Sequence, residues 1–202
     1  MNEPVLGTQP DALAKFGRQI RPPSKSKTIY LLVGPSGSGK STLSSYPKEW
    51  GVSELVSTTT REPRPGEVEG VNYYYVTPEQ FAQIPMIEQT EYAGQLYGTS
   101  KQEIERILVE NNSTFAIVDR HGVKAFKEIY GDMVKVIYIH APFFLLIDRM
   151  KARNDSLKAI ASRVKHALGT NEQDAINDAD YCIINLDLGE ARRQLRCIVG
   201  VG

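Results

Sequence analysis

Short unbroken apolar runs alternate with amphipathic stretches along most of the chain, and the two patterns predict different elements. Runs rich in β-branched and aromatic side chains are typical of strands buried on both faces of a parallel sheet. Such runs occupy residues 28–33, 114–119, 134–139 and 181–184. Apolar residues spaced three and four apart predict helices over residues 101–111, 123–130, 145–151, 158–168 and 190–198. Because strands that alternate with helices form right-handed β-α-β units, we expect an α/β fold with helices on both faces of a parallel sheet.

The pattern changes between Thr58 and Ser100, where short β-type runs alternate with turn residues. We expect strands near residues 72–76, 86–90 and 95–97, bounded by proline or glycine. A further strand near Leu55 to Thr59 would lead into this region. The sequence therefore predicts a small, mostly β insert inside the α/β core.

The first 27 residues are interpreted as an N-terminal extension. Leu13, Phe16 and Ile20 fall at helical spacing, which indicates a packing helix or a flexible arm without chemistry of its own. The chain is thereby divided into an extension and one domain. The expected divisions are the extension 1–27 and the domain 28–202, with a core of 28–57 and 101–202 and an insert of about 58–100.

Composition excludes several classes of function. Of the 202 residues, 24 are basic and 24 acidic, so a net charge of zero gives no sign of binding to nucleic acid or to a membrane surface. No apolar run is long enough to span a bilayer, and the N-terminus lacks a secretory signal pattern. Cys182 and Cys197 are expected to be reduced thiols, and the three histidines do not form a ligand set. We predict a cytoplasmic protein, and both a monomer and a homo-oligomer are compatible with the sequence.

Directly after the first predicted strand, the chain matches the phosphate-binding pattern G-x-x-x-x-G-K-[ST]. Glycines free the backbone to wrap a polyanion with its N–H groups, and the positive end of the following helix dipole points to the same place. Lys40 would reach the terminal phosphates of a nucleoside triphosphate, and the Ser41 hydroxyl would ligate Mg²⁺. Pro47 is expected to end or kink the following helix. The residues of this P-loop are Gly34, Pro35, Ser36, Gly37, Ser38, Gly39, Lys40, Ser41 and Thr42.

Two arginines in the insert indicate a second anion site. Arg61 and Arg64 lie three residues apart around a proline-containing turn. A pair of guanidinium groups can clamp a phosphate group through bidentate hydrogen bonds, and Tyr73 and Tyr97 would add neutral donors. The alternative is a solvated basic loop, because exposed arginine is common. The arginines alone leave both interpretations open.

Several stretches of the chain resemble the guanylate kinase family. The similarity runs from about Thr28 to the C-terminus and joins two long motifs at a compatible distance, which makes it more specific than the P-loop alone. The matching residues are Ser57 to Glu67, Gly70, Asn72, Tyr73, Glu88, Tyr97 to Ser100, Asp119 and Gly122. The resemblance implies a P-loop NTPase-type parallel sheet with an insert that binds GMP and a short helical lid. It also implies phosphoryl transfer from ATP to GMP, and to dGMP as well, with Mg²⁺.

The resemblance assigns roles to individual side chains of the acceptor site. Arg61, Arg64, Tyr73 and Tyr97 would hold the phosphate of GMP, while Ser57, Glu88, Thr99 and Asp119 would face its guanine. The chemistry supports this role for Glu88, because an ionised carboxylate only accepts hydrogen bonds and guanine offers adjacent N1–H and N2–H donors. Adenine presents a bare N1 acceptor instead, so such a site would reject it by on the order of 10⁴.

Three arginines, Arg149, Arg153 and Arg163, match positions of the family at the ATP site and on the lid. Their spacing fits a helix end, a hinge and a helix start, so a lid of about residues 153–162 would close over the triphosphate. Arg153 and Arg163 would then act in catalysis together with Lys40 and Arg61, because positive charge stabilises the transferring phosphoryl group.

The chain departs from the family pattern at two positions. Ile117 stands where the family usually has an acidic residue, two before Asp119, and this change would thin the Mg²⁺ shell. Leu186 stands where an aspartate often follows Asn185, the residue that matches the family's contact with the adenine of ATP.

Two other functions are compatible with these residues. Guanylate kinase-like domains also serve as inactive protein-binding modules, an interpretation that Ile117 favours and that the intact Lys40 and Ser41 oppose. A related P-loop kinase acting on a phosphorylated sugar would not need Ser57, Glu88 and Thr99 as a set that faces guanine.

Overall fold

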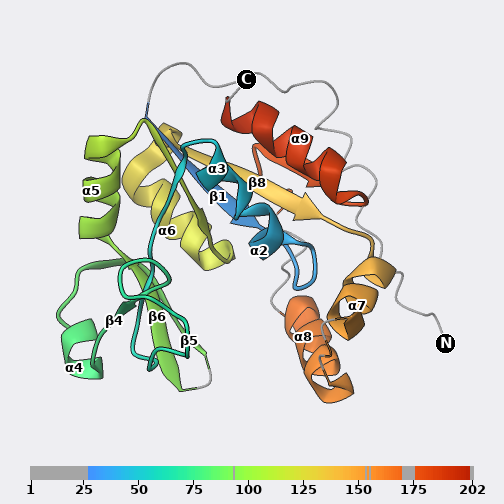
Figure 1. Cartoon of the computed structure of the whole chain (residues 1–202), viewed down its shortest axis with the longest axis horizontal. Coiled ribbons are helices and arrows are strands. Elements are labelled where there is room, and N and C mark those ends of the chain that lie inside the picture. The colour runs from blue at the N-terminus through green and yellow to red at the C-terminus, as the bar shows by residue number, and fades with distance from the viewer. Residues whose placement is uncertain (1–26, 93, 153, 155, 170–175, 201–202) are drawn as a thin grey trace.

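The computed structural model describes residues 27–200, except Ala93, Arg153, Asp155 and residues 170–175 (Figure 1). The sequence-predicted helical pattern from Leu13 to Ile20 lies outside the described residues, as does Arg153 of the predicted lid. In the described part of the chain, no helix combines the length and the apolar character needed to cross a membrane.

A five-stranded parallel sheet forms the centre of the molecule, in the order β2-β7-β1-β8-β9. Its strands are β1 (Thr28–Val33), β2 (Ser53–Glu54), β7 (Ser113–Ile117), β8 (Val134–His140) and β9 (Tyr181–Ile184). β1 pairs with β7 on one side and with β8 on the other, and all six of its residues are buried. A strand enclosed in this way needs apolar side chains on both faces, which is why an unbroken apolar run identifies it in the sequence. The predicted α/β fold with a parallel sheet is confirmed.

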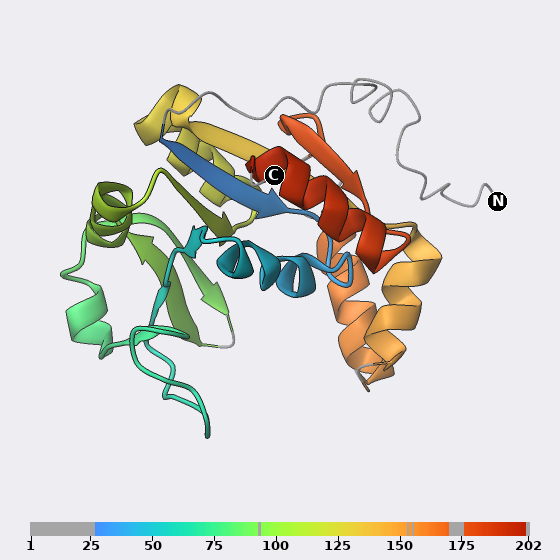
Figure 2. The same ribbon diagram turned by 45° about the horizontal axis from the view of Figure 1, so that its top comes forward.

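Helices cover both faces of this sheet (Figure 2). Alternate residues of β1 belong to the cores on its two sides. Ile29, Leu31 and Val33 belong to the core on the side of α5 and α6. Tyr30 and Leu32 belong to the opposite core, which contains residues of α2 and α9. These helices are α2 (Lys40–Leu43), α5 (Lys101–Glu110), α6 (Arg120–Tyr130) and α9 (Leu188–Val199), and a short α3 (Tyr46–Glu49) follows α2. The predicted break near Pro47 is confirmed, because α2 ends before it and α3 carries this proline in its first turn.

Two helices beside the P-loop form a separate pair. They are α7 (Phe143–Ala152) and α8 (Leu157–Gly169), which extend the predicted helices by one or two residues at each end. Leu146 and Met150 of α7 pack with Ile160 of α8 in a small core of their own. In both ribbon views the pair lies on one side of the P-loop and the second sheet, described next, lies on the other.

Residues 58–100 contain a second sheet of four strands in the order β4-β3-β6-β5. Its elements are β3 (Thr58–Thr59), β4 (Tyr74–Tyr75), α4 (Pro78–Phe81), β5 (Met86–Tyr92) and β6 (Gln95–Ser100). β5 and β6 form an antiparallel hairpin, and β3 pairs with β6 antiparallel and with β4 parallel. The strands expected in this region are therefore all present, and β5 and β6 are longer than predicted.

The single strand expected near Leu55 to Thr59 is wrong, because β2 and β3 are two short strands in different sheets. The N–H of Leu55 still donates to the carbonyl of Phe115 in the main sheet, at 2.9 Å. The next N–H, that of Val56, donates instead to the carboxylate of Glu103, at 3.1 Å. The chain thus leaves the main sheet at Val56. Local pattern does not reveal this change, since strand pairing is set by distant residues.

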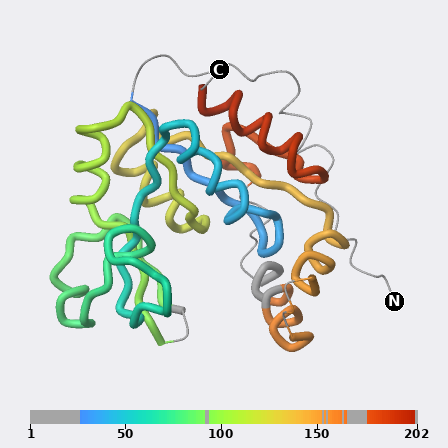
Figure 3. Tube along the Cα trace, in the orientation of Figure 1, coloured from blue at the N-terminus to red at the C-terminus, as the bar shows by residue number. Residues whose placement is uncertain are grey.

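Glu103, in the first turn of α5, contacts both segments where the chain passes between the two sheets. Figure 3 traces the path of the chain from the main sheet into the smaller one and back. The residue is 3% exposed, and its carboxylate accepts hydrogen bonds from Val56 N–H and from the Tyr74 hydroxyl of β4, both at 3.1 Å. Arg106 completes the ion pair, with its Nε 3.0 Å from the carboxylate. β6 runs into α5 without a loop, and Ser100 is the N-cap of that helix. Both crossings between the sheets therefore lie beside one buried carboxylate.

Candidate active site

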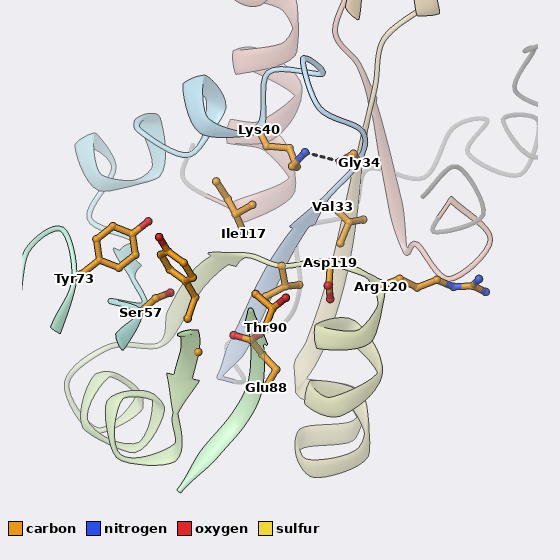
Figure 4. A pocket seen from close by; sticks show the side chains of 13 residues that line it. Val33, Gly34, Lys40, Ser57, Tyr73, Glu88, Thr90, Ile117, Asp119 and Arg120 are labelled. Carbon is orange, nitrogen blue, oxygen red and sulfur yellow. Dashed lines mark hydrogen bonds between the residues drawn. The ribbon is translucent and has the colours of Figure 1, made fainter. Parts of the chain in front are cut away.

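The P-loop follows β1 and leads into α2, and its backbone requires glycine. Gly37 and Gly39 have φ angles of 84° and 99°, a region that favours glycine. There is also no space for a side chain, because a Cβ on Gly37 would lie 2.8 Å from the carbonyl oxygen of Leu146 in α7. The Lys40 ammonium donates hydrogen bonds to the carbonyls of Gly34 and Pro35 (Figure 4). The loop lies at the carboxyl end of a central parallel strand, where open α/β sheets bind their ligands.

Arg149 and Asn185, two residues predicted at the ATP site, lie against the backbone of this loop. Asn185 is 2% exposed, and its side-chain amide donates to the carbonyl of Ser38 at 2.7 Å. Arg149 donates to the carbonyl of Asn185 at 2.8 Å and to that of Ser38 at 3.3 Å. The structure therefore brings both residues to the P-loop, through contacts with its peptide groups.

A cavity of about 320 Å³ extends from the P-loop to the second sheet (Figure 4). It is lined by Val33, Gly34, Lys40, Ser57, Tyr73, Glu88, Thr90, Tyr97, Gly98, Ile117, Val118, Asp119 and Arg120. Seven of the sequence-predicted site residues belong to this lining. They come from the P-loop, β5, β6, the segments after β2 and β7, and the residue before β4: Gly34, Lys40, Ser57, Tyr73, Glu88, Tyr97 and Asp119. Residues up to 87 positions apart in the chain, Val33 and Arg120, thus face one space. The cavity is the candidate site for a reaction between a P-loop ligand and a second molecule.

Two carboxylates, Glu88 and Asp119, face this cavity from different sheets. Glu88 accepts a hydrogen bond from the hydroxyl of Thr99, which is 1% exposed, at 2.9 Å. Burial raises the pKa of Glu88, the charge of Asp119 raises it further, and the Thr99 hydrogen bond opposes both. Asp119 is the N-cap of α6, where its Oδ1 accepts from the N–H of Gly122 at 2.8 Å. The fixed, partly buried Glu88 carboxylate is suited to accept hydrogen bonds from a planar ligand.

Arg61 lies beside the cavity rather than in its lining, and its guanidinium is only 15% exposed. Its Nη2 is 2.9 Å from both carboxylate oxygens of Glu67, and its Nη1 donates to the carbonyl of Glu62 at 2.7 Å. The guanidinium also lies over the rings of Tyr73 and Tyr75, at 5.4 and 5.8 Å from their centres. The hydrogen bond with Glu67 raises the pKa of Arg61, so the group is a permanent, oriented positive charge.

Glu67, which the sequence patterns did not single out for a role, is the residue that holds Arg61 in place. The pKa of Glu67 is lowered to about 2. The largest cause is the hydrogen bond from the backbone N–H of Arg64, at 2.8 Å, and the hydrogen bonds from the Tyr75 hydroxyl and from Arg61 act in the same direction. The side chain of Arg64 itself is exposed. The signal available in the sequence was an acidic residue three positions after Arg64, at the end of a turn. Its partners Arg61 and Arg64 lie in the same turn, and the Tyr75 hydroxyl of β4 lies eight positions further on.

The remaining predicted residues are placed as follows. Tyr73 and Tyr97 meet edge to face, 6.0 Å apart, between Arg61 and the cavity, and burial raises the pKa of Tyr73. Ser41 and Thr42 are exposed in the first turn of α2. Arg163 lies on α8, but its side chain, like all of Arg153, is outside the described part.

The donor set of the described residues suits a magnesium ion that is bound together with phosphates. Among these residues, no group of three or more His, Cys, Asp or Glu side chains is placed to hold a metal ion. Mg²⁺ does not require such a cage, because it keeps several waters and uses one or two protein oxygens with substrate phosphates. The exposed Ser41 hydroxyl and the Asp119 carboxylate offer that chemistry. Ile117, 38% exposed in the cavity lining, adds an apolar surface instead of an oxygen.

A family model described as guanylate kinase matches residues 26–200 of the chain. The guanylate kinase of Synechocystis sp. is 33% identical over 181 residues, which cover 85% of this chain and 93% of that protein. The guanylate kinase of Symbiobacterium thermophilum is 35% identical over 185 residues, which cover 88% of this chain and 87% of that protein.

A solved structure agrees with these sequence similarities. The crystal structure of guanylate kinase from Anaplasma phagocytophilum is similar with a TM-score of 0.61 and 28% sequence identity. The similarity covers 85% of this chain and 84% of the crystallised chain. Sequence and fold thus point to the same family over nearly all of the described residues.

Proposed function

The chain belongs to the guanylate kinase family, and we propose that it transfers the terminal phosphoryl group of ATP to GMP, forming ADP and GDP. One observation carries the proposal: the P-loop lysine, Lys40, and a fixed carboxylate, Glu88, line the same cavity. A P-loop alone indicates a nucleotide or phosphate ligand. The carboxylate opposite it identifies the second substrate as one with hydrogen-bond donors on a planar edge.

Glu88 is proposed to read the guanine base. The N1–H and N2–H groups of guanine form a pair of adjacent donors, and a carboxylate is a pair of acceptors. Thr99 donates to one carboxylate oxygen, at 2.9 Å, and so fixes the plane of the group while leaving acceptor capacity for the base. Ser57 and Asp119, which line the same cavity, are proposed to contact the base as well.

Arg61, Tyr73 and Tyr97 are proposed to bind the phosphate of GMP, with Arg64 joining from the exposed turn. Arg61 is held by Glu67 and by the rings of Tyr73 and Tyr75, so little side-chain entropy is lost when it binds an anion. Because recognition is concentrated on base and phosphate, we propose dGMP as a second acceptor.

In the transfer, an oxygen of the GMP phosphate attacks the terminal phosphorus of ATP as the bond to ADP breaks. Backbone N–H groups of the P-loop and Lys40 would hold the ATP phosphates, and Arg153 and Arg163 are proposed to add positive charge there. Ser41 would hold Mg²⁺, with Asp119 near its water shell, and the ion would neutralise charge on the phosphate oxygens.

Cys182 and Cys197 are thiols and not a disulfide, which supports the predicted cytoplasmic location.

The test is steady-state ADP formation with ATP, Mg²⁺ and a panel of GMP, dGMP, AMP, CMP, UMP and ribose 5-phosphate. We expect turnover with GMP and dGMP, and a kcat/KM for AMP lower by on the order of 10⁴. GMP binding without ADP formation would indicate the inactive binding module. Turnover of ribose 5-phosphate with GMP ignored would indicate the sugar-phosphate kinase, and either result overturns the proposal.

A further inference from the structure

The P-loop is held by an amide that comes from the far edge of the main sheet. Asn185 directly follows β9, and its backbone N–H donates to the carbonyl of His140 at the end of β8, at 2.7 Å. Its side-chain Nδ2 donates to the carbonyl of Ser38 at 2.7 Å, across 147 positions of sequence. One residue therefore ties the loop to the ends of two strands.

The contact between this amide and the loop is close. A Cβ on Gly39 would lie 2.3 Å from the Nδ2 of Asn185, so any other residue at position 39 would collide with the amide. Arg149 supports the same place, since its guanidinium donates to the carbonyls of Ser38 and Asn185. The Ser38 carbonyl thus accepts hydrogen bonds from two side chains that lie outside the loop.

Fixing this carbonyl also fixes the N–H group on the other side of the peptide bond. The C=O and N–H of a trans peptide point in opposite directions. When the Ser38 carbonyl is held on Asn185, the N–H of Gly39 points away from Asn185, and N–H groups of such loops are the donors that bind phosphate. The amide is therefore placed to set the direction of a phosphate-binding donor.

The rest of the Asn185 side chain supports this role rather than contact with a base. Within the described residues, its Oδ1 and the Oγ of Ser38 are buried without a hydrogen-bond partner. An apolar side chain would fill the same space without an unpaired acceptor, which costs free energy when buried. The distinctive contribution of the amide here is the donor to Ser38.

We propose that Asn185 is a positioning residue of the donor site, which acts on the phosphates through the P-loop peptide and not on the adenine. The inference rests on the proposed function only in taking ATP as the ligand of the P-loop. It departs from the expectation drawn from the family resemblance, because the amide is 2% exposed and already bonded to the loop.

The experiment compares ATP with a ligand that has no base. Affinities for ATP and for inorganic tripolyphosphate are measured by calorimetry on wild type, Asn185→Ala and Asn185→Leu, the second of which keeps the volume and removes the donor. We expect the affinities of both variants for ATP and for tripolyphosphate to fall by about tenfold, and their affinity for GMP to stay unchanged. Full recovery in Asn185→Leu would show that the residue only fills space, and would overturn the proposal.

Comparing the loss of ATP affinity with the loss of tripolyphosphate affinity shows whether Asn185 acts through the P-loop or contacts the adenine. A loss for ATP with tripolyphosphate unchanged would assign Asn185 to the adenine, and unchanged binding of both ligands would leave it no role at the donor site. Either result overturns the inference, whereas wild-type turnover with GMP tests the proposed function separately. The matched control is Leu186→Ala, the neighbouring residue with 60% exposure, which should bind tripolyphosphate within about twofold of wild type.

A measurement on the wild type keeps the test valid if the variants do not fold. The side-chain amide protons of Asn185, observed by NMR, should exchange slowly and should shift by the same amount with tripolyphosphate and with ATP. A shift with ATP alone would contradict the proposal.

Discussion

The P-loop and the acceptor clamp, formed by Arg61, Glu67 and the tyrosines around them, both carry positive charge and are both proposed to bind phosphate, but they are built differently. The P-loop is fixed by buried contacts, since Ser38 is fully buried and Asn185 is 2% exposed. The clamp is made of partly buried side chains from the turn after β3 and from the second sheet, and one carboxylate, Glu67, holds its guanidinium. The proposed donor site is thus organised by the core. The proposed acceptor site depends on a few side-chain contacts that single substitutions can remove.

The largest expected effect is the loss of the P-loop charge. Lys40→Ala should lower kcat by at least about 10³-fold, because no other described cation in the cavity lining comes from the P-loop. Steady-state ADP formation with GMP measures the effect. Lys48→Ala is the control, since that lysine pairs with Glu54 on the surface, and it should retain wild-type activity. A kcat of Lys40→Ala within tenfold of the wild-type value would contradict the role proposed for Lys40.

A substitution of Glu88, the residue proposed to bind guanine, should change the KM for GMP strongly and the KM for ATP little. Glu88→Gln replaces one acceptor oxygen by a donor that opposes the donors of guanine, and KM for GMP should rise by about 10²-fold. KM for ATP should stay within about twofold. Glu91→Gln, an exposed position on the same strand, is the control and should change neither constant. Equal losses for ATP and GMP would remove Glu88 from the guanine site.

The clamp can be weakened without changing the residues that are proposed to contact guanine. Glu67→Gln removes the charge that orients Arg61, and the affinity for GMP should fall by about tenfold while guanosine, which lacks the phosphate, binds as before. Glu62→Gln is the control, because only the backbone carbonyl of that residue contacts Arg61. If guanosine lost as much affinity as GMP, Glu67 would act on the pocket as a whole and the contrast between the two sites would fail.

As the pH falls, binding of guanine at Glu88 should weaken before the Arg61–Glu67 ion pair of the clamp is lost. The pKa of Glu88 is raised above its ordinary value of 4.5, whereas that of Glu67 is lowered to about 2. Guanosine affinity should therefore decrease as pH falls toward and below the Glu88 pKa, approaching about tenfold per pH unit. Titration calorimetry between pH 8 and pH 4 measures this, and Glu88→Gln should give a flat profile. A wild-type profile equally flat would show that Glu88 is not the titrating group.

The smallest expected effect is on stability. Because the Glu88 pKa is higher in the folded than in the unfolded protein, the free energy of unfolding decreases as pH rises through that pKa. At neutral pH the buried charge is therefore unfavourable, and Glu88→Gln should raise the melting temperature by about 2 °C. The difference should vanish below the unfolded pKa, where both side chains are neutral. A variant that melts lower at pH 7 would mean that the hydrogen bond with Thr99 outweighs burial.

The main sheet and the P-loop were predictable from the sequence because their signals are local. An unbroken apolar run such as Thr28–Val33 identifies a buried strand, and the spacing of glycines and Lys40 identifies the loop that follows it. The split between β2 and β3 was not predictable, since both have the same local character and differ only in their distant partners.

The contacts that orient the site residues were also beyond a reading of the sequence. Glu67 obtains its role from Tyr75 and Arg61, and Asn185 from the Ser38 carbonyl, which lies 147 positions away. Positions matched by resemblance name a residue but not the atom that it contacts. For that reason Asn185 was expected at the adenine, while its amide lies on the P-loop.

The placement of Glu103 has a consequence for how the two substrates come together. The chain passes between the two sheets at Val56, whose N–H donates to the Glu103 carboxylate, and at Ser100, whose hydroxyl accepts from the Glu103 N–H. A rotation of the smaller sheet about this point would break no strand pairing, because every strand pairs within its own sheet. It would change the gap between Lys40 and Glu88, which line the same cavity. Glu103 does not line that cavity, so the spacing between the two proposed nucleotide sites would be set by a residue outside it.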